Sequence, residues 1–217
     1  MIVAIDGPAG SGKGTITKLV ASRCNLVYID TGATYRCVAL SVIENNLNLN
    51  EEDKIIELTK SLNIDFTLDG KTILNGKDVS DRIRDKDVTS IVSPVSSIVK
   101  VREILVDVQR NMAKGKNIIM EGRDITTVVF PNADYKFYLD ASVEERANRR
   151  YIQTREKGID MSYEEIIDNI KKRDYNDSNK PVGALKRTDD QIYIDSTNMT
   201  IDEVVNKIVS IIGSEEK

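Results

Sequence analysis

The sequence contains no histidine and only two cysteines in 217 residues. Without an imidazole, a catalytic triad with a histidine base, a histidine zinc site and histidine acid–base catalysis are all excluded. Cys24 and Cys37 do not form a CxxC pair, so neither a disulfide framework nor a cysteine-rich metal site is expected. We expect both thiols to be small, buried apolar side chains in a reducing cytoplasm. Chemistry in this protein must therefore use Lys, Arg, Asp, Glu, backbone amides or a bound metal.

Long apolar runs and a strong excess of charge are also missing. The longest stretch without a charged residue, residues 88–99, is far shorter than the ~20 residues of a transmembrane helix. No basic segment or cleavage site accompanies the first apolar run, so no export signal is expected. Lys and Arg total 31 against 35 Asp and Glu, a net charge of −4, which argues against binding a nucleic-acid polymer through overall charge. The composition is that of a globular, cytoplasmic protein.

Short apolar runs recur along the chain, and longer stretches with helical spacing separate them. Most of these runs end at an acidic residue or at glycines. This pattern predicts a parallel sheet with helices on both faces, which is a doubly wound α/β fold. The expected strands are residues 2–5, 26–29, 118–120, 135–139 and 192–194, and the expected helices include residues 99–114, 143–157, 163–174 and 201–212.

Two of the expected helices carry a start signal. Ser142 with Glu145, and Ser162 with Glu165, have the Ser-x-x-Glu spacing of a capping box. After the last helix, residues 213–217 are expected to fray.

Residues 63–79 break the alternation of strands and helices. Three short runs with strand character are separated by Asp69-Gly70 and Asn75-Gly76, residue pairs that are favoured in two-residue hairpin turns. We expect a small antiparallel meander. It is too small to hold a core of its own and is therefore an insertion in the α/β core.

A glycine-rich segment follows the first expected strand directly and opens a helix. Its Gly7-x4-Gly12-Lys13 spacing is that of a P-loop, in which backbone amides and a helix N-terminus surround phosphate oxygens and the lysine reaches the β- and γ-phosphates. Gly14 stands where a hydroxyl residue usually follows the lysine, and Thr15 comes one place later, a variant typical of nucleoside monophosphate kinases. The expected ATP-binding residues here are Gly7, Pro8, Ala9, Gly10, Ser11, Gly12, Lys13, Gly14 and Thr15.

A P-loop alone leaves motors, GTPases, transporter ATPases and small-molecule kinases open. The guanine signature Asn-Lys-x-Asp is missing, because residues 179–182 read Asn-Lys-Pro-Val. A transporter-type Leu-Ser-Gly-Gly-Gln and an Asp-x-x-Gly switch after the P-loop are missing too. These absences favour a small-molecule kinase. A nucleotide-gated binding protein that hydrolyses ATP slowly, and a structural protein with a vestigial P-loop, stay open at this point.

Beyond the P-loop, a series of ordered motifs resembles bacterial cytidylate kinases over essentially the whole chain. The motifs are residues 7–15, 30–36 (Asp-Thr-Gly-Ala-Thr-Tyr-Arg), 101–103, 122–124, 127–131, 144–150 and 195–197. The small-sheet insertion also distinguishes this family from adenylate kinases. The resemblance implies transfer of a phosphoryl group from ATP to CMP or dCMP, with Mg²⁺ on the nucleotide. A kinase for UMP or another small acceptor is the alternative within the enzyme class.

The resemblance also implies how the chain is organised. It indicates one kinase domain with a P-loop NTPase-type doubly wound parallel sheet, a small antiparallel β insertion and a short helical lid. The core comprises residues 1–30, 99–143 and 181–217, the monophosphate-binding insertion about residues 31–98, and the lid about residues 144–160. The expected partners are small nucleotides, with no nucleic-acid polymer and no membrane, and the chain is expected to be a monomer.

The family's functional residues map onto matching positions of this sequence. The residue matching Arg123 holds the acceptor phosphate, and the lid arginines stabilise the phosphoryl group in transfer. Thr15 and Glu121 are candidates for contact with Mg²⁺. The implied CMP-binding residues are Thr31, Tyr35, Arg36, Ser93, Arg102, Arg123, Asp124, Arg173, Asp177 and Lys180. The implied catalytic residues are Lys13, Arg123, Arg149, Arg150 and Arg173, with Arg146 on ATP and Arg155 as a weaker lid candidate.

Ser93, Arg102 and Asp124 match the residues that contact cytosine in the family, and the chemistry of the ring agrees. A carboxylate accepts from the N4 amino group of cytosine, and a guanidinium donates toward N3 and O2. Uracil would present O4 to the carboxylate and N3–H to the guanidinium, and each such buried mismatch costs ~1–3 kcal/mol. A structural ion pair between Arg102 and Asp124 is the alternative.

Three positions depart from the family pattern. Lys180 replaces an arginine and cannot make its planar bidentate contact. Thr126 occupies a position beside the acceptor site that is usually glycine, and Glu121 replaces a common aspartate at a strand end. Arg36 and residues 173–180 have a structural alternative as solvated surface. The alternative for the arginines of residues 146–150 is a basic surface helix paired with Glu144, Glu145 and Glu156.

Overall fold

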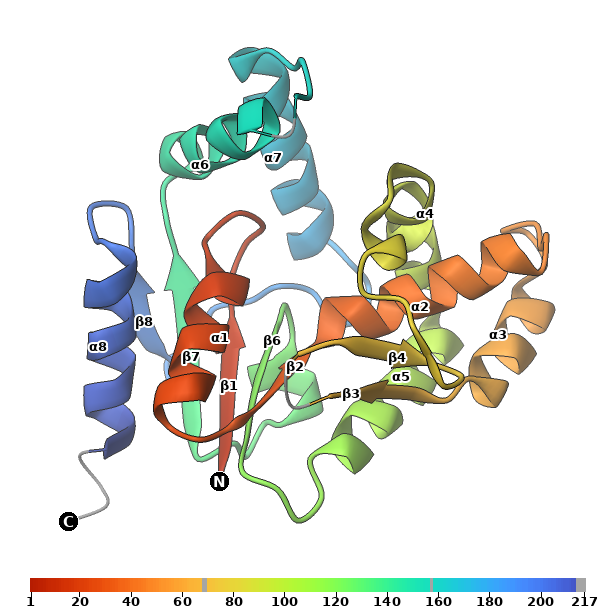
Figure 1. Ribbon diagram of the computed structural model, residues 1–217, viewed down its shortest axis with the longest axis horizontal. Helices are drawn as coiled ribbons and strands as arrows, with labels where there is room; N and C mark the ends of the chain where they lie inside the picture. The colour runs from red at the N-terminus through yellow and green to blue at the C-terminus, as the bar shows by residue number, and fades with distance from the viewer. Residues whose placement is uncertain (68–69, 157, 214–217) are drawn as a thin grey trace. The chain divides into compact units, whose positions relative to one another are not determined.

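The computed structural model describes residues 1–67, 70–156 and 158–213 (Figure 1). The expected turn residue Asp69, the end of an expected helix at residue 157 and residues 214–217 of the expected frayed end lie outside the described residues. The chain forms two compact units. The first unit combines Met1–Leu26 with Ile118–Lys217, and the second unit is Val27–Asn117.

In the first unit, four parallel strands lie side by side in the order β6-β1-β7-β8. They are β1 (Ile2–Asp6), β6 (Ile118–Gly122), β7 (Tyr135–Asp140) and β8 (Ile192–Asp195). Asp6 is paired with Gly122 on one side and Tyr138 on the other, so the strands end at a common edge. Each strand overlaps an expected one, and the prediction of an α/β fold with a parallel sheet is confirmed.

The helices of the first unit are α1 (Lys13–Arg23), α6 (Val143–Glu156), α7 (Tyr163–Ser178) and α8 (Ile201–Gly213), with a π-helical turn η2 (Ile125–Val129). Helix α1 packs beside α8, and α6 packs beside α7 (Figure 1). Helix α7 ends at Ser178 rather than at residue 174 as predicted. No helix of the described residues is long and apolar enough to cross a bilayer.

The central strands are continuous apolar runs because side chains are buried on both of their faces. Residues 3–5 of β1 and 118–120 of β6 are fully buried. The outermost strand, β8, differs, since Ile192 and Tyr193 are each 37% exposed. The guanidinium carbon of Arg187 lies 4.1 Å from the centre of the Tyr193 ring. Because consecutive strand residues face opposite sides of a sheet, both sides of β8 are partly open at its start.

The described part of the second unit contains β2 (Val27–Asp30), five helical segments and a small antiparallel sheet. The sheet has the order β3-β4-β5, with β3 (Ile64–Phe66), β4 (Thr72–Leu74) and β5 (Lys77–Asp78). The helical segments are α2 (Thr31–Glu44), α3 (Glu52–Ser61), η1 (Arg82–Arg84), α4 (Lys86–Ser97) and α5 (Val99–Met112). The meander and the helix predicted for residues 99–114 are confirmed.

Helix α2 forms the centre of the second unit. Its residues 37–40 are at most 1% exposed, because other segments pack around the helix. Ile64 of β3 and Leu74 of β4 belong to the same buried cluster, so the meander packs into a larger core. At the β4–β5 turn, Asn75 and Gly76 both have positive φ (50° and 80°), as a type I′ hairpin requires.

The two predicted capping boxes have different outcomes. Ser162 and Glu165 form both reciprocal hydrogen bonds at the start of α7. Before α6, the Ser142 hydroxyl accepts from the Glu145 amide as expected, but the return bond is missing. The Ser142 amide donates to Thr197, and the Glu145 carboxylate accepts from the Arg149 guanidinium. Arg149, one turn later on α6, and Thr197, after β8, have therefore replaced half of the box.

The two cysteines differ in their surroundings, and neither is in a disulfide within the described residues. Cys37 of α2 is fully buried as expected, and burial raises the pKa of its thiol to about 12. The expectation of burial is wrong for Cys24, which is partly exposed. Cys24 is the C-cap residue that directly follows the last residue of α1, Arg23, so it is not part of the buried face of the helix.

These surroundings predict unequal thiol reactivity. At pH 8 a thiol with a pKa of about 12 is ionised in only ~1 molecule in 10⁴, and the thiolate is the nucleophile. We expect one fast-reacting thiol, Cys24, when the folded protein is titrated with a disulfide reagent, and two thiols in denaturant. A Cys24→Ser variant that still shows one fast thiol would contradict the burial of Cys37.

Candidate functional site

The glycine-rich loop lies at the sheet edge where the parallel strands end. It leaves β1 at Asp6 and enters α1 at Lys13. A Cβ atom on Gly7 would lie 2.0 Å from the backbone oxygen of Leu139 in β7, so only glycine allows the chain to pass there. Gly12 caps α1 with a φ of 89°, in the left-handed region. The helix therefore begins with its N-terminus at the loop, where the dipole favours an anion.

Lys13 lies inside this loop and is only 4% exposed. Its Nζ donates to the carbonyl oxygens of Gly7 and Pro8, both at 2.7 Å, and to Ser11 Oγ at 3.3 Å. Burial lowers the pKa of Lys13 well below its usual value, and the positive charge of Arg123 acts in the same direction. The side-chain nitrogen of Lys13 is therefore hydrogen-bonded to oxygens of the loop instead of to water.

Two arginines of α6 bind further carbonyl groups of the loop. Arg146 is 4% exposed and donates to the Ala9 carbonyl at 3.1 Å. Arg149 donates to the Ser11 carbonyl at 3.2 Å and to the Ser196 carbonyl at 2.8 Å. Together with Lys13, these side chains place three positive charges on the carbonyl groups of the P-loop.

Arg146 also joins α6 to α7. Its two terminal nitrogens donate to the Asp174 carboxylate at 3.0 and 2.7 Å, a bidentate pair, and its Nε donates to the Ala141 carbonyl at 2.9 Å. The remaining arginines of this helix are exposed. Arg150 makes no hydrogen bond or ion pair with any described residue, and Arg155 stacks on Tyr151 with its guanidinium carbon 5.3 Å from the ring centre.

A second group of charged residues lies where β6 ends. Arg123 Nε donates to Asp177 Oδ2 at 2.8 Å, and Lys180 Nζ lies 3.4 Å from Asp177 Oδ1. Burial alone would raise the pKa of Asp177, but the charges of Arg123 and Lys180 outweigh it and hold this pKa below its usual value. Arg173 precedes Asp177 by one turn of α7, whereas Lys180 lies beyond the end of the helix.

Asp124, 6% exposed before η2, belongs to the first unit, and the second unit holds the remaining expected acceptor-binding residues. Arg36 NH2 lies 2.6 Å from Asp30 Oδ2, while its buried Nε has no hydrogen-bond partner among the described residues. Arg102 of α5 is 5% exposed, and its guanidinium carbon lies 5.4 Å from the centre of the Tyr35 ring. Thr31 begins α2, and Ser93 is exposed on α4. The unsatisfied donor of the Arg36 guanidinium suits an anionic ligand.

Several residues near these groups were not singled out from the sequence. Asp6 is fully buried at the end of β1 and accepts three hydrogen bonds from Ile125 and Thr126. Its position before the P-loop, at the end of a buried strand, was a usable signal. Asp174, the partner of Arg146, and Arg84, 3.5 Å from Asp30, had no signal in spacing or motif.

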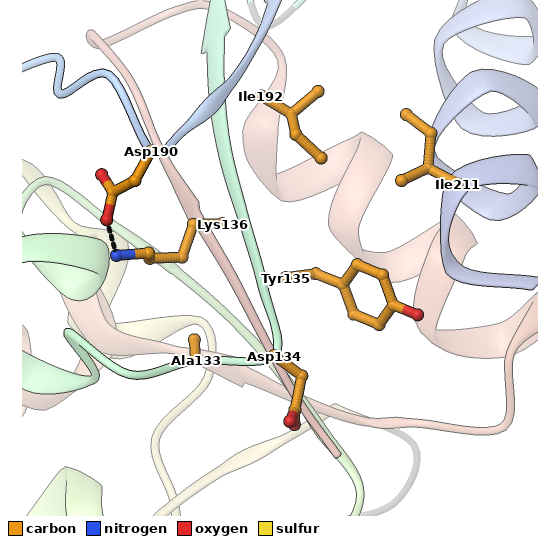
Figure 2. Close-up of a pocket in the computed structure, with 7 residues that line it drawn as sticks. All are labelled: Ala133, Asp134, Tyr135, Lys136, Asp190, Ile192 and Ile211. Atoms are coloured by element: carbon orange, nitrogen blue, oxygen red, sulfur yellow. Dashed lines mark hydrogen bonds and ion pairs between the residues drawn. The ribbon is translucent and has the colours of Figure 1, made fainter. Parts of the chain in front are cut away.

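A shallow pocket of about 190 Å³ lies at the other end of β7 (Figure 2). Tyr135, Ile192 and Ile211 lie on one side of it, and the ion pair of Lys136 with Asp190 lies on the other. Tyr135 begins β7, whereas the P-loop passes the other end of that strand at Leu139. This pocket is therefore separate from the charged groups described above.

A parallel sheet with a strand, a glycine loop and a helix, and with a buried lysine inside the loop, defines the class of P-loop nucleotide-binding proteins. A sequence profile described as cytidylate kinase matches residues 3–214. The chain belongs to the cytidylate kinase family.

Curated relatives agree over nearly their whole length. The chain is 49% identical to a cytidylate kinase of Fusobacterium nucleatum over 208 residues, which are 96% of this chain and 95% of the relative. It is 46% identical to a cytidylate kinase of Caldanaerobacter subterraneus over 216 residues, 99% of this chain and 96% of the relative. A shikimate kinase from Bacteroides thetaiotaomicron has a similar fold, with 11% identity, a TM-score of 0.51 and 98% of each chain covered.

The passage of Gly7 beside β7 predicts that Gly7→Ala is strongly damaging. The added Cβ would have to displace a strand of the sheet, at a cost of about 1–3 kcal/mol or more. We expect a lower melting temperature and no stabilisation by ATP with Mg²⁺ in thermal unfolding. Gly213→Ala is the control, because a Cβ there meets nothing within 4 Å. An unchanged melting temperature for Gly7→Ala would show that the loop is not so confined.

The Arg123–Asp177 pair predicts a pH-dependent contribution to stability. Because the folded-state pKa of Asp177 is lowered, the stabilisation is present above the unfolded pKa of about 3.9 and is lost as the pH falls through the folded-state pKa. Asp177→Asn should cost about 1–3 kcal/mol at pH 7 and progressively less below pH ~4. Urea unfolding across pH measures this, with the exposed Asp189→Asn as control. A pH-independent difference would refute the assignment.

Proposed function

We propose that this protein transfers the γ-phosphoryl group of ATP to CMP or dCMP, and so forms ADP and CDP or dCDP. The observation that carries the proposal is the buried Lys13 inside a P-loop of a cytidylate kinase family member. The acceptor phosphate is already anionic at neutral pH, so the reaction requires positioning and charge neutralisation rather than a general base. A chain without histidine can supply both.

On the donor side, residues 7–15 bind the ATP phosphates through backbone amides and the α1 N-terminus. Lys13, Arg149 and Arg150 neutralise charge on the phosphoryl group during transfer. For Lys13, this means exchanging loop carbonyls for phosphate oxygens, whose negative charge offsets the cost of burying the ammonium group. Arg146 supports ATP binding by holding Ala9 of the loop and Asp174 of α7 in place.

On the acceptor side, Arg36, Arg123 and Arg173 bind the CMP phosphate. The unpartnered Nε of Arg36 supports this role, since a phosphate oxygen is a suitable acceptor for it. Asp177, oriented by Arg123, accepts hydrogen bonds from the ribose hydroxyls, with Lys180 beside it. Thr31 and Tyr35 are the other residues of this group that we propose to bind CMP.

Cytosine is recognised by Ser93, Arg102 and Asp124. The carboxylate of Asp124 accepts from the N4 amino group, and the Arg102 guanidinium donates toward N3 and O2. Both side chains are nearly buried, at 6% and 5% exposure, so a mismatched base edge would be costly. Discrimination against uracil follows from this pair.

Mg²⁺ enters with the nucleotide in this proposal. The described residues contain no group of three His, Cys, Asp or Glu that could hold a metal. Mg²⁺ commonly keeps several waters and binds substrate phosphates with few protein ligands, so the donors present fit it. The Thr15 hydroxyl and the Glu121 carboxylate would hold the hydrated ion, which supplies charge neutralisation of the ATP phosphates. We further propose a monomer that acts in the cytoplasm on small nucleotides.

The decisive experiment measures ADP release from ATP with Mg²⁺ for CMP, dCMP, UMP and AMP. We expect the highest kcat/KM for CMP or dCMP. Asp124→Ala should lower kcat/KM for CMP by about 10- to 100-fold and leave the KM for ATP within about twofold. The exposed Asp53→Ala is the matched control.

Other outcomes favour the alternatives. Preference for UMP would identify a different acceptor specificity. ATP turnover indifferent to CMP would favour a nucleotide-gated binding protein. An Asp124→Ala variant with unchanged use of CMP would remove Asp124 from the base site while leaving the phosphoryl transfer itself in place.

A further inference from the structure

Asp6 is a fully buried carboxylate at the end of β1, one residue before the P-loop. Its Oδ1 accepts from the Ile125 amide at 2.9 Å, and its Oδ2 accepts from the Thr126 amide at 2.8 Å and the Thr126 hydroxyl at 2.6 Å. Three donors from one short segment therefore converge on this side chain. Such convergence fixes the segment relative to β1, because breaking any of these bonds would leave a buried polar group unsatisfied.

The three donors follow directly after Arg123 and Asp124. Asp124 is the residue before the first turn of η2, a position where an aspartate commonly bonds the first amides of its own helix. Its side chain makes no such cap bond here. Asp6 bonds the first two amides of η2 instead. The start of η2 is thus held by a residue of the central strand, and the Asp124 carboxylate is not used for capping.

Thr126 extends this connection to the segment before β8. The Gln191 amide nitrogen donates to the Thr126 hydroxyl oxygen, and the Gln191 side-chain oxygen accepts from the Thr188 amide at 2.8 Å. Thr126 and Gln191 are 2% and 7% exposed. Since the hydroxyl donates to Asp6 and accepts from Gln191, both partners fix its rotamer. A glycine at position 126 would have no hydroxyl for either bond.

We infer that Asp6, Thr126 and Gln191 are positioning residues that hold Arg123 and Asp124 at the base of the P-loop and thereby set the affinity and choice of the acceptor nucleotide. This inference rests on the proposed function. Asp6 is paired with Gly122 and Tyr138 on either side, so the strand itself stays fixed when the Thr126 hydroxyl is lost. The displaced part is the segment that begins at Arg123. The effect therefore falls on the acceptor and not on ATP.

Thr126→Val tests this, because valine keeps the shape of threonine and lacks the hydroxyl. We expect the KM for CMP to rise about tenfold and the CMP-to-UMP ratio of kcat/KM to fall by a similar factor, while the KM for ATP stays within about twofold. Thr126→Ser keeps the hydroxyl, so its KM for CMP and its CMP-to-UMP ratio of kcat/KM should stay close to the wild-type values. Gln191→Met should shift the same two parameters in the same direction.

Thr59→Val is the control for a purely structural loss. Thr59 is 3% exposed, and its hydroxyl donates to the Ile55 carbonyl within α3. If Thr126→Val lowers the melting temperature as Thr59→Val does but leaves the KM for CMP and the CMP-to-UMP ratio unchanged, the inference is overturned. Amide hydrogen exchange in η2 gives a second test that does not depend on turnover. Faster exchange in Thr126→Val supports the inference, and unchanged exchange opposes the inference. Wild-type protein that does not phosphorylate CMP would reject the proposed function, whatever the exchange result.

Discussion

The conformation of the P-loop depends on hydrogen bonds from cationic side chains to its own carbonyl groups. Lys13 binds two of these oxygens from inside the loop, and Arg146 and Arg149 bind two more from α6. Peptide groups that turn their N–H toward a bound anion turn their C=O away from it, so those oxygens need hydrogen-bond donors, and here cationic side chains supply them. Lys13 and Arg149, which stabilise the loop, are also residues to which the proposed function assigns charge neutralisation during phosphoryl transfer. This dual use explains why folding and chemistry cannot be separated cleanly in this part of the chain.

Much of the fold is predictable because it is local. Strands with continuous apolar residues, and a turn of two residues with positive φ at Asn75-Gly76, follow from side-chain chemistry within a few positions. One capping box is incomplete because other partners compete for its groups. Glu145 was predicted to complete a capping box, but Arg149 takes its carboxylate and Thr197 takes the Ser142 amide. The Glu145–Arg149 pair has the i, i+4 spacing of a helical ion pair and is visible in the sequence, whereas Thr197 lies 55 positions from Ser142 and is not.

In the candidate site, too, contiguous motifs are predictable from the sequence, whereas pairings between distant residues are not. The P-loop could be recognised because its glycines and lysine are contiguous and each has a physical reason. The role of Asp6 could have been suspected from its place at a strand end, yet its partner Thr126 is 120 positions away. Asp174, which fixes Arg146, is 28 positions from it on another helix. The type of a charged residue is visible in a sequence, whereas the pairing that decides whether it is structural or chemical is a property of the folded chain.

The outer strand of the first unit has a consequence for behaviour in concentrated solution. An edge strand offers unpaired backbone groups to other molecules, and this is a common route to aggregation. β8 is short, ends in Asp195, and has the Arg187 guanidinium stacked over Tyr193. A strand from another copy would find few backbone groups to pair with and would approach an acidic end. These features protect the edge against intermolecular β-pairing at no expense to the sheet interior.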